Sequence, residues 1–63
     1  MKELDCVELT ESFEGLPKGT KGTVVFLYEG RHAEVEFFDG DDKTIGVLTV
    51  PTNLLKVVWT PTK

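Results

Sequence analysis

Residues 23–38 read TVVFLYEGRHAEVEFF and decide the fold, because they predict two strands joined by a tight turn. Thr23 to Tyr28 consists of β-branched, aliphatic and aromatic residues, and Ala33 to Phe38 repeats this character with glutamates interleaved. Between them, Glu29 to His32 contains Gly30, which can adopt the positive φ that a tight hairpin requires. We therefore expect an antiparallel pair.

The chain on either side of this pair continues the pattern of strands and turns. Upstream, Leu4 to Leu9 alternates apolar and acidic residues and predicts a half-buried strand, while Ser12 to Gly22 is rich in glycine and predicts a long loop. Downstream, Asp39 to Lys43 is made of turn-forming residues, and Thr44 to Val50 is again rich in strand-forming residues. A second hairpin follows from this arrangement.

The last part of the chain supplies a helical turn and a fifth strand. Pro51 lacks a backbone donor and ends the ladder, Thr52 and Asn53 suit a single helical turn, and Leu54 to Trp59 returns to strand character. Five short strands with a single 3-10 turn before the last one predict an all-β fold, a small, partly open barrel of the SH3-like type. An OB-like barrel is the competing fold, but it usually needs a longer chain and a real helix. The barrel domain is expected to span residues 1–59, with 60–63 as a flexible C-terminal tail.

Alternation along the strands also predicts which side chains point inward. A strand presents successive side chains to opposite faces, so every second residue of each run belongs to the core. The predicted inward set is Val7, Leu9, Val24, Phe26, Val35, Phe37, Ile45, Val47, Leu55 and Val57.

Composition limits the classes of function. Seven Lys and Arg against eleven Asp and Glu give a net charge of -4, which disfavours a reader of nucleic-acid phosphates and an anionic membrane surface. No apolar run approaches the roughly 20 residues that span a bilayer, and the acidic start does not resemble a signal peptide. The single cysteine excludes an internal disulfide, and no zinc spacing is present. We expect a cytoplasmic protein without a cofactor, whose core rests on packing alone.

The segment Leu16 to Val25 reads LPKGTKGTVV, a Leu-Pro pair that leads to a Gly-x-x-Gly-Thr-Val-Val strand. It resembles a family of short bacterial proteins, common in cyanobacteria, that is described as a domain of unknown function. Val35-Glu36-Phe37 resembles that family's second strand, and the closing segment is matched by Thr49-Val50-Pro51 followed by Leu54 or Leu55 and Val57. The resemblance covers roughly residues 4–58. It implies a small accessory or partner-binding protein, one version of which is the antitoxin of a two-gene module, and it defines no catalytic residue.

The same plan is similar, more loosely, to SH3-like barrels in the KOW modules of ribosomal and transcription-associated proteins, in the β subunit of nitrile hydratase and in a ferredoxin-docking subunit of the photosynthetic NADH dehydrogenase-like complex. These proteins share a fold and a Gly-Thr-Val start to a strand, without a common chemistry. This likeness therefore bears on the fold and not on the function.

No catalytic or metal-binding constellation stands out. Cys6 and His32 are the only thiol and imidazole, but they are expected on a core-like strand and at a hairpin end, which does not favour a nucleophilic dyad. Asp39, Asp41 and Asp42 could supply oxygen ligands to a hard cation, yet an ordinary solvated turn is the favoured interpretation. The segment 19–22 lacks the sequence and the following helix of a phosphate-binding P-loop. We therefore expect no enzymatic activity.

Apolar residues on outward phases indicate a binding surface. Tyr28, Phe38 and Trp59 are predicted to form an exposed cluster, and aromatic residues dominate the binding energy of protein interfaces. A purely structural role, in which the rings cap the open ends of the barrel, explains these residues equally well. Acidic residues would form a rim that steers basic partners: Glu11, Glu14, Glu29, Asp39, Asp41 and Asp42.

The leading hypothesis is a non-catalytic module that binds a protein partner through an apolar patch with an acidic rim, and self-association through the last strand is an option. A specific version is an antitoxin or immunity protein that masks a partner enzyme. The alternative from another class is a KOW-like nucleic-acid-binding module, which the net charge opposes. That module would use Lys18, Lys21, Arg31 and Lys56 on one face, with Phe38 or Tyr28 stacked on a base.

Overall fold

The computed structural model describes residues 1–62 and contains five antiparallel strands in one sheet. The strands are β1 (Cys6–Leu9), β2 (Lys21–Tyr28), β3 (His32–Phe38), β4 (Thr44–Pro51) and β5 (Leu55–Trp59), and the 3-10 turn η1 (Thr52–Leu54) precedes β5. The predicted all-β class and the single 3-10 turn before the last strand are confirmed. Lys63, the last residue of the expected tail, lies outside the described residues.

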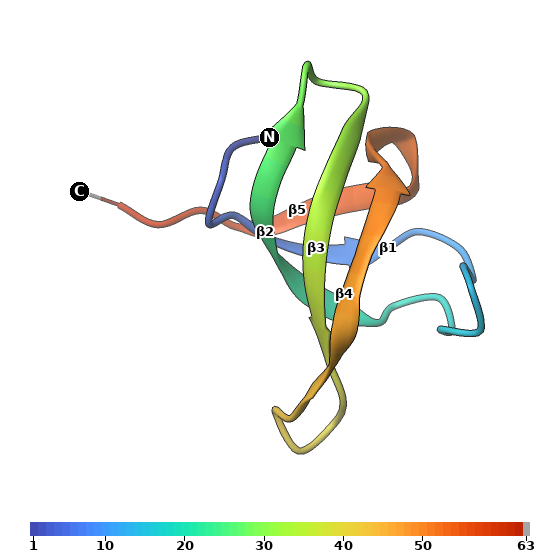
Figure 1. The fold of residues 1–63 in the computed structure, drawn as a ribbon. Helices are drawn as coiled ribbons and strands as arrows, with labels where there is room; N and C mark the ends of the chain where they lie inside the picture. Colours follow the sequence, from blue (N-terminus) through green and yellow to red (C-terminus); the bar gives the residue numbers. More distant parts are fainter. Residues whose placement is uncertain (63) are drawn as a thin grey trace.

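The strand order is β4-β3-β2-β1-β5, so β4 and β5 are the two edges and the sheet is not closed. Figure 1 shows β2, β3 and β4 side by side, with β1 and β5 crossing behind them. This is the open arrangement that the sequence predicts. Within residues 1–62, no helix has the length and hydropathy needed to cross a membrane.

The core lies on the inner side of this curved sheet. Its buried hydrophobic residues are Val7, Leu9, Val24, Ala33, Val35, Phe37, Val50 and Leu55. Five more apolar residues pack partly buried against them: Phe13, Leu16, Leu27, Leu48 and Leu54. The predicted inward set is thus correct at Val7, Leu9, Val24, Val35, Phe37 and Leu55, whereas Ala33 and Val50 were not predicted.

Gly22 fits where a larger residue would not. It is buried on β2 and pairs with Phe37 of β3. A Cβ at this position would lie 2.6 Å from the carbonyl oxygen of Glu36 and 2.6 Å from Cγ1 of Val35. The close approach of β2 and β3 therefore depends on the missing side chain.

Phe26 was predicted to point inward and is instead 48% exposed. The cause is a β-bulge in β2, where the register with β3 shifts between Val24 and Phe26. The extra residue reverses the alternation, so that Phe26 pairs with Glu34 on the outward side and Leu27 pairs with Ala33 on the inner side.

The predictions for Ile45 and Val47 were also wrong, since these side chains are 49% and 52% exposed on the outward side. Val57 lies on the predicted inward phase but is 38% exposed. In β4, Leu48 pairs with the buried Val35, which turns Val47 outward. Ile45 follows the same outward phase next to a register shift at the start of the strand. Val57 pairs with the buried Val7, but it lies on the edge strand β5 and stays partly uncovered.

The first strand begins at Cys6 rather than at Leu4, because residues 2–5 form a turn. The Asp5 N–H donates to the Lys2 carbonyl at 3.2 Å, and the Lys2 N–H donates to Oδ2 of Asp5 at 2.8 Å. Leu4 has a φ of 75° in this turn, a left-handed conformation that favours glycine. Asp5 is 2% exposed, and its Oδ1 has no hydrogen-bond partner among residues 1–62.

Candidate functional site

The outward side of β2, β3 and β4 carries apolar and acidic side chains in neighbouring rows. Residues that pair across antiparallel strands share one face, so Phe26 lies beside Glu34 and Val47 lies beside Glu36. We name this surface the outer face. It is defined by Phe26, Tyr28, Glu34, Glu36, Phe38, Ile45 and Val47.

The outer face carries several of the chain's exposed large hydrophobic side chains. In residues 1–62, ten large hydrophobic side chains are exposed, against eight hydrophobic residues in the core. Four of the ten belong to the outer face: Phe26, Tyr28, Ile45 and Val47. They form two groups on one side of the sheet, Phe26 and Tyr28 on β2 and Ile45 and Val47 on β4, with the carboxylates of β3 between them.

Two aromatic rings on β2 contact each other on this surface. The ring centroids of Phe26 and Tyr28 are 4.9 Å apart, with the ring planes at 70°, an edge-to-face arrangement. The bulge that turns Phe26 outward is what brings it onto the same side as Tyr28. Together they present a fixed aromatic corner to solvent.

Two carboxylates of β3 lie between the apolar rows of β2 and β4. Oε2 of Glu36 accepts a hydrogen bond of 2.7 Å from the Thr44 hydroxyl, and Oε1 of Glu34 accepts one from the Thr49 hydroxyl. Each carboxylate is thus positioned across β3 and β4 by one bond. Because a carboxylate has about four acceptor positions, capacity for a partner's donors remains.

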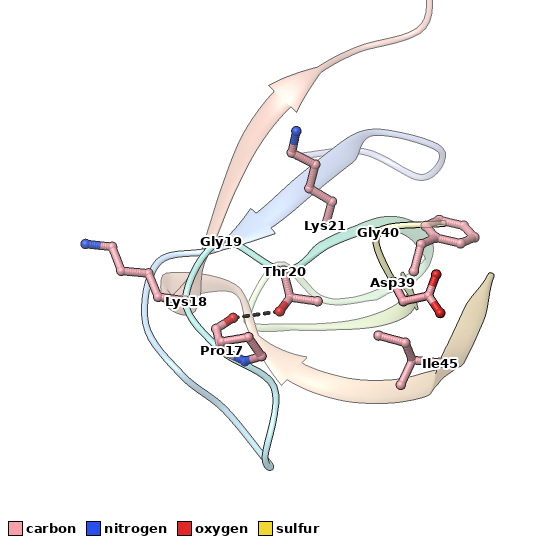
Figure 2. A pocket seen from close by; sticks show the side chains of 9 residues that line it. Pro17, Lys18, Gly19, Thr20, Lys21, Asp39, Gly40 and Ile45 are labelled. Atoms are coloured by element: carbon pink, nitrogen blue, oxygen red, sulfur yellow. Dashed lines mark hydrogen bonds between the residues drawn. The ribbon is translucent and has the colours of Figure 1, made fainter. Parts of the chain in front are cut away.

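A groove opens where the β1–β2 loop meets the β3–β4 turn, at one end of the outer face. Its volume is about 560 Å³, and we name it the end groove. On one side the Thr20 hydroxyl donates to the Pro17 carbonyl at 2.7 Å, and Asp39 and Ile45 lie on the other side (Figure 2). The lining residues are Pro17, Lys18, Gly19, Thr20, Lys21, Phe38, Asp39, Gly40 and Ile45.

Three lysines gather around this end of the sheet. Lys18 lines both the end groove and a neighbouring hollow of about 300 Å³, which Lys56 and Glu8 also line. Glu8 pairs with Lys21 on β2 and with Lys56 on β5, so these residues are neighbours across three strands. All three lysines are exposed, and Lys18 and Lys21 extend away from the groove floor (Figure 2). Three of the seven basic residues of the chain therefore lie at this end, interspersed with Glu8 and Asp39.

The acidic turn is a structured element. Oδ1 of Asp39 accepts the backbone N–H groups of Asp41 and Lys43, at 2.8 and 3.0 Å, and the Asp39 N–H donates to the Lys43 carbonyl at 2.9 Å. Asp41 and Asp42 are exposed. Within residues 1–62, no group of three or more His, Cys, Asp or Glu side chains is placed to hold a metal ion. Asp39 thus shapes one rim of the end groove.

The three predicted aromatic residues are not brought together. Tyr28 ends β2, whereas Phe38 pairs with Lys21, the first residue of that eight-residue strand. At about 3.3 Å per residue, the two ends are roughly 23 Å apart along the strand. Trp59 is 57% exposed on β5, where it pairs with Cys6. Tyr28 packs against Phe26 instead, and Phe38 lines the end groove.

Two other predicted groups of residues are also separated by the fold. Cys6 pairs with Thr23, near the start of β2, and His32 pairs with Tyr28 at its end, so the thiol and the imidazole do not meet. Of the lysines named for a nucleic-acid-binding module, Lys18 and Lys21 line the end groove with Phe38, and Lys56 lines the hollow beside it. Arg31 lies in the β2–β3 turn, at the other end of the strand pair.

Sequence reasoning missed most of the outer face. Phe26, Ile45 and Val47 were assigned to the core, because a bulge and a register shift leave no mark on the hydrophobic pattern. Glu34 and Glu36 were left out of the acidic rim although their alternation with Val35 identified them as outward. This alternation in β3, extended to the residues that pair with it on β2 and β4, was the signal in the sequence that could have identified the outer face.

Comparison with known proteins gives a family without an assigned activity. The family model described as "Domain of unknown function (DUF4926)" matches residues 3–57. No curated protein and no solved structure shows significant similarity to the chain. The resemblance to an uncharacterised family is confirmed, and the looser likeness to SH3-like barrels stays a prediction.

Proposed function

Since the chain belongs to the family described as a domain of unknown function (DUF4926), we propose its function from the surface alone: a non-catalytic module that binds a partner protein through the outer face. The family description assigns no substrate and no activity. The proposal therefore stands on the side chains that the sheet presents to solvent.

One observation carries the proposal, namely the outward orientation of large apolar side chains on β2 and β4. Phe26, Ile45 and Val47 are each about half exposed, at 48%, 49% and 52%. Covering apolar surface is favourable by roughly 25 cal/mol per Å², and aromatic residues are the usual anchors of protein interfaces. A partner that covers this face would bury side chains that the small core leaves outside.

The carboxylates of Glu34 and Glu36 support the choice of a protein partner. They are half-buried, each is positioned by a threonine hydroxyl, and each pairs with one apolar residue, Phe26 or Val47, an arrangement that favours donors at fixed places. Polar groups of this kind set the orientation of a docked protein more than its affinity. These two carboxylates thus lie between the apolar rows of β2 and β4.

The separation of Cys6 from His32 supports the non-catalytic part of the proposal. A nucleophile needs a base within hydrogen-bond distance, about 2.6–3.2 Å. Cys6 lies beside Thr23, and His32 lies beside Tyr28 at the far end of β2. The thiol and the imidazole therefore do not form such a pair.

The test is capture of the partner by the tagged protein from its native cell extract. The paired variant Phe26→Ser with Val47→Ser should lose a protein that the wild type retains stoichiometrically. Val58→Ser, an exposed valine on β5, is the matched control and should retain it. Equal capture by all three proteins would refute the use of the outer face. Recovery of nucleic acid alone would favour the KOW-like alternative, and a nuclease as the captured partner would favour the antitoxin version.

A further inference from the structure

The end groove differs from the rest of the surface in charge. The chain has seven basic residues, and three of them, Lys18, Lys21 and Lys56, lie at the end groove or in the hollow beside it. The central part of the outer face carries the carboxylates of Glu34 and Glu36 instead. A partner that covers both regions meets lysines interspersed with Glu8 and Asp39 at the end, and carboxylates alone in the middle, so the two regions favour different groups on the partner.

The groove is also apolar enough to hold a side chain. Pro17, Phe38 and Ile45 contribute its apolar lining, and the backbone of Gly19 and Gly40 leaves room at both rims. Phe38 and Ile45 belong to the outer face as well, so the groove continues that surface without a break. An extended segment that leaves the outer face would pass directly into the groove.

We infer that the end groove binds an extended segment of the partner protein in which acidic residues alternate with apolar ones. The inference rests on the proposed function and adds the chemistry of the segment. The apolar side chain occupies the space beside Phe38 and Ile45, and the carboxylates face Lys18 and Lys21. Electrostatic complementarity of this kind accelerates association and fixes the register of the bound segment.

A peptide carboxylate suits this groove better than a nucleic-acid backbone. Glu8 lies between Lys21 and Lys56, and Asp39 forms the opposite rim, so negative charges alternate with the lysines. A phosphate backbone carries regularly spaced charges and needs several adjacent cations. One or two carboxylates can contact the lysines while the neighbouring apolar residues avoid Glu8 and Asp39.

The experiment is an amide NMR titration of the full chain with two synthetic peptides, one alternating Glu with Leu and Phe, the other with Lys in place of each Glu. The acidic peptide should shift the amides of residues 18–21, 38–40 and 45, and should bind at least about tenfold more tightly than the basic one. The double variant Lys18→Glu with Lys21→Glu should abolish the difference. Lys18→Gln with Lys21→Gln should reduce it, and since both lysines are exposed, its spectrum away from the groove should match the wild type.

Equal binding of the two peptides, or shifts confined to Phe26, Tyr28 and their neighbours, would overturn the inference. So would tighter binding of a uridine oligonucleotide than of the acidic peptide. The capture experiment separates this failure from that of the proposed function. A partner lost with the Phe26 and Val47 variant but kept with both lysine variants would leave the protein-binding function standing and remove the acidic segment. A partner kept by every variant would remove both.

Discussion

Replacement of Gly22 by alanine should be the most damaging single methyl addition in the sheet. The new Cβ would lie 2.6 Å from the Glu36 carbonyl oxygen, 2.6 Å from Cγ1 of Val35 and 3.1 Å from Cδ1 of Phe37. Ordinary van der Waals contact begins at 3.4 Å, so the first two atoms must each move by about 0.8 Å. One of them is backbone in the middle of β3, which is paired on both sides.

The expected cost is about 3 kcal/mol, the upper part of the usual range for overpacking, because rotation of a side chain cannot relieve a clash with backbone. A chain of this length has a free energy of unfolding of roughly 3–9 kcal/mol, so the variant should lose a third of it or more. The melting temperature should fall by roughly 12–24 °C. Urea unfolding followed by circular dichroism measures the free energy of unfolding, and a thermal melt followed in the same way measures the melting temperature.

Gly46→Ala is the matched control, since Gly46 lies on β4 opposite Phe37 and a Cβ there would meet nothing within 4 Å. Its free energy of unfolding should stay the same or rise by up to about 1 kcal/mol, because alanine restricts the unfolded chain. A loss below about 1 kcal/mol at Gly22, or equal losses at the two glycines, would refute the close packing of β2 against β3.

Three further predictions test particular features of the structure. Val50→Ala should destabilise the fold by about 2 kcal/mol and Val47→Ala by less than about 0.5 kcal/mol, since Val50 is buried and Val47 is 52% exposed on the same strand. Equal losses in urea unfolding would contradict the assignment of Val50 to the inner side of β4 and of Val47 to the outer side. Asp39→Ala should cost about 1–2 kcal/mol through loss of two hydrogen bonds in the turn, whereas Asp39→Asn keeps an acceptor oxygen and should cost less, and thermal melts that rank them otherwise would count against the turn. Leu4→Gly should raise the free energy of unfolding by about 0.5–1 kcal/mol by removing the strain of a φ of 75°, while Leu4→Ala keeps that strain. If the glycine variant is no more stable than the alanine variant in urea unfolding, the turn is unstrained.

The sequence was sufficient for the parts of the fold that depend on local chemistry. Gly30 and the acidic segment before Lys43 marked both hairpin turns, and Pro51 marked the start of the 3-10 turn. These residues act through φ preferences and missing donors, which operate over a few positions. Element bounds therefore agree with prediction to within two residues at each strand.

The faces of the strands were less predictable, and so was the candidate site. A bulge adds one residue to a strand and so moves every later side chain of that strand to the opposite face. Here Val25 and Phe26, at the bulge, are both apolar, so the hydrophobic pattern does not reveal it. In β4 both phases of the alternation are apolar, so Val47 and Leu48 could not be told apart before their partners on β3 were known. The end groove joins segments about twenty positions apart in the chain, a proximity that no local pattern encodes.

The place of β1 between β2 and β5 has a consequence for the order of assembly. The pairs β2–β3 and β3–β4 join neighbours in the chain, such as Tyr28 and His32, but β1–β5 joins Leu9 to Leu55, 46 positions away (55 minus 9). Such a distant pairing has the largest loop-closure entropy to overcome and forms late. Until β5 docks, the backbone edge of β1 that faces away from β2 is unpaired. The β5 strand of a second molecule can pair with this edge as well as the β5 strand of the same chain can. Refolding at high concentration should therefore favour strand-exchanged dimers in which each chain completes the sheet of the other.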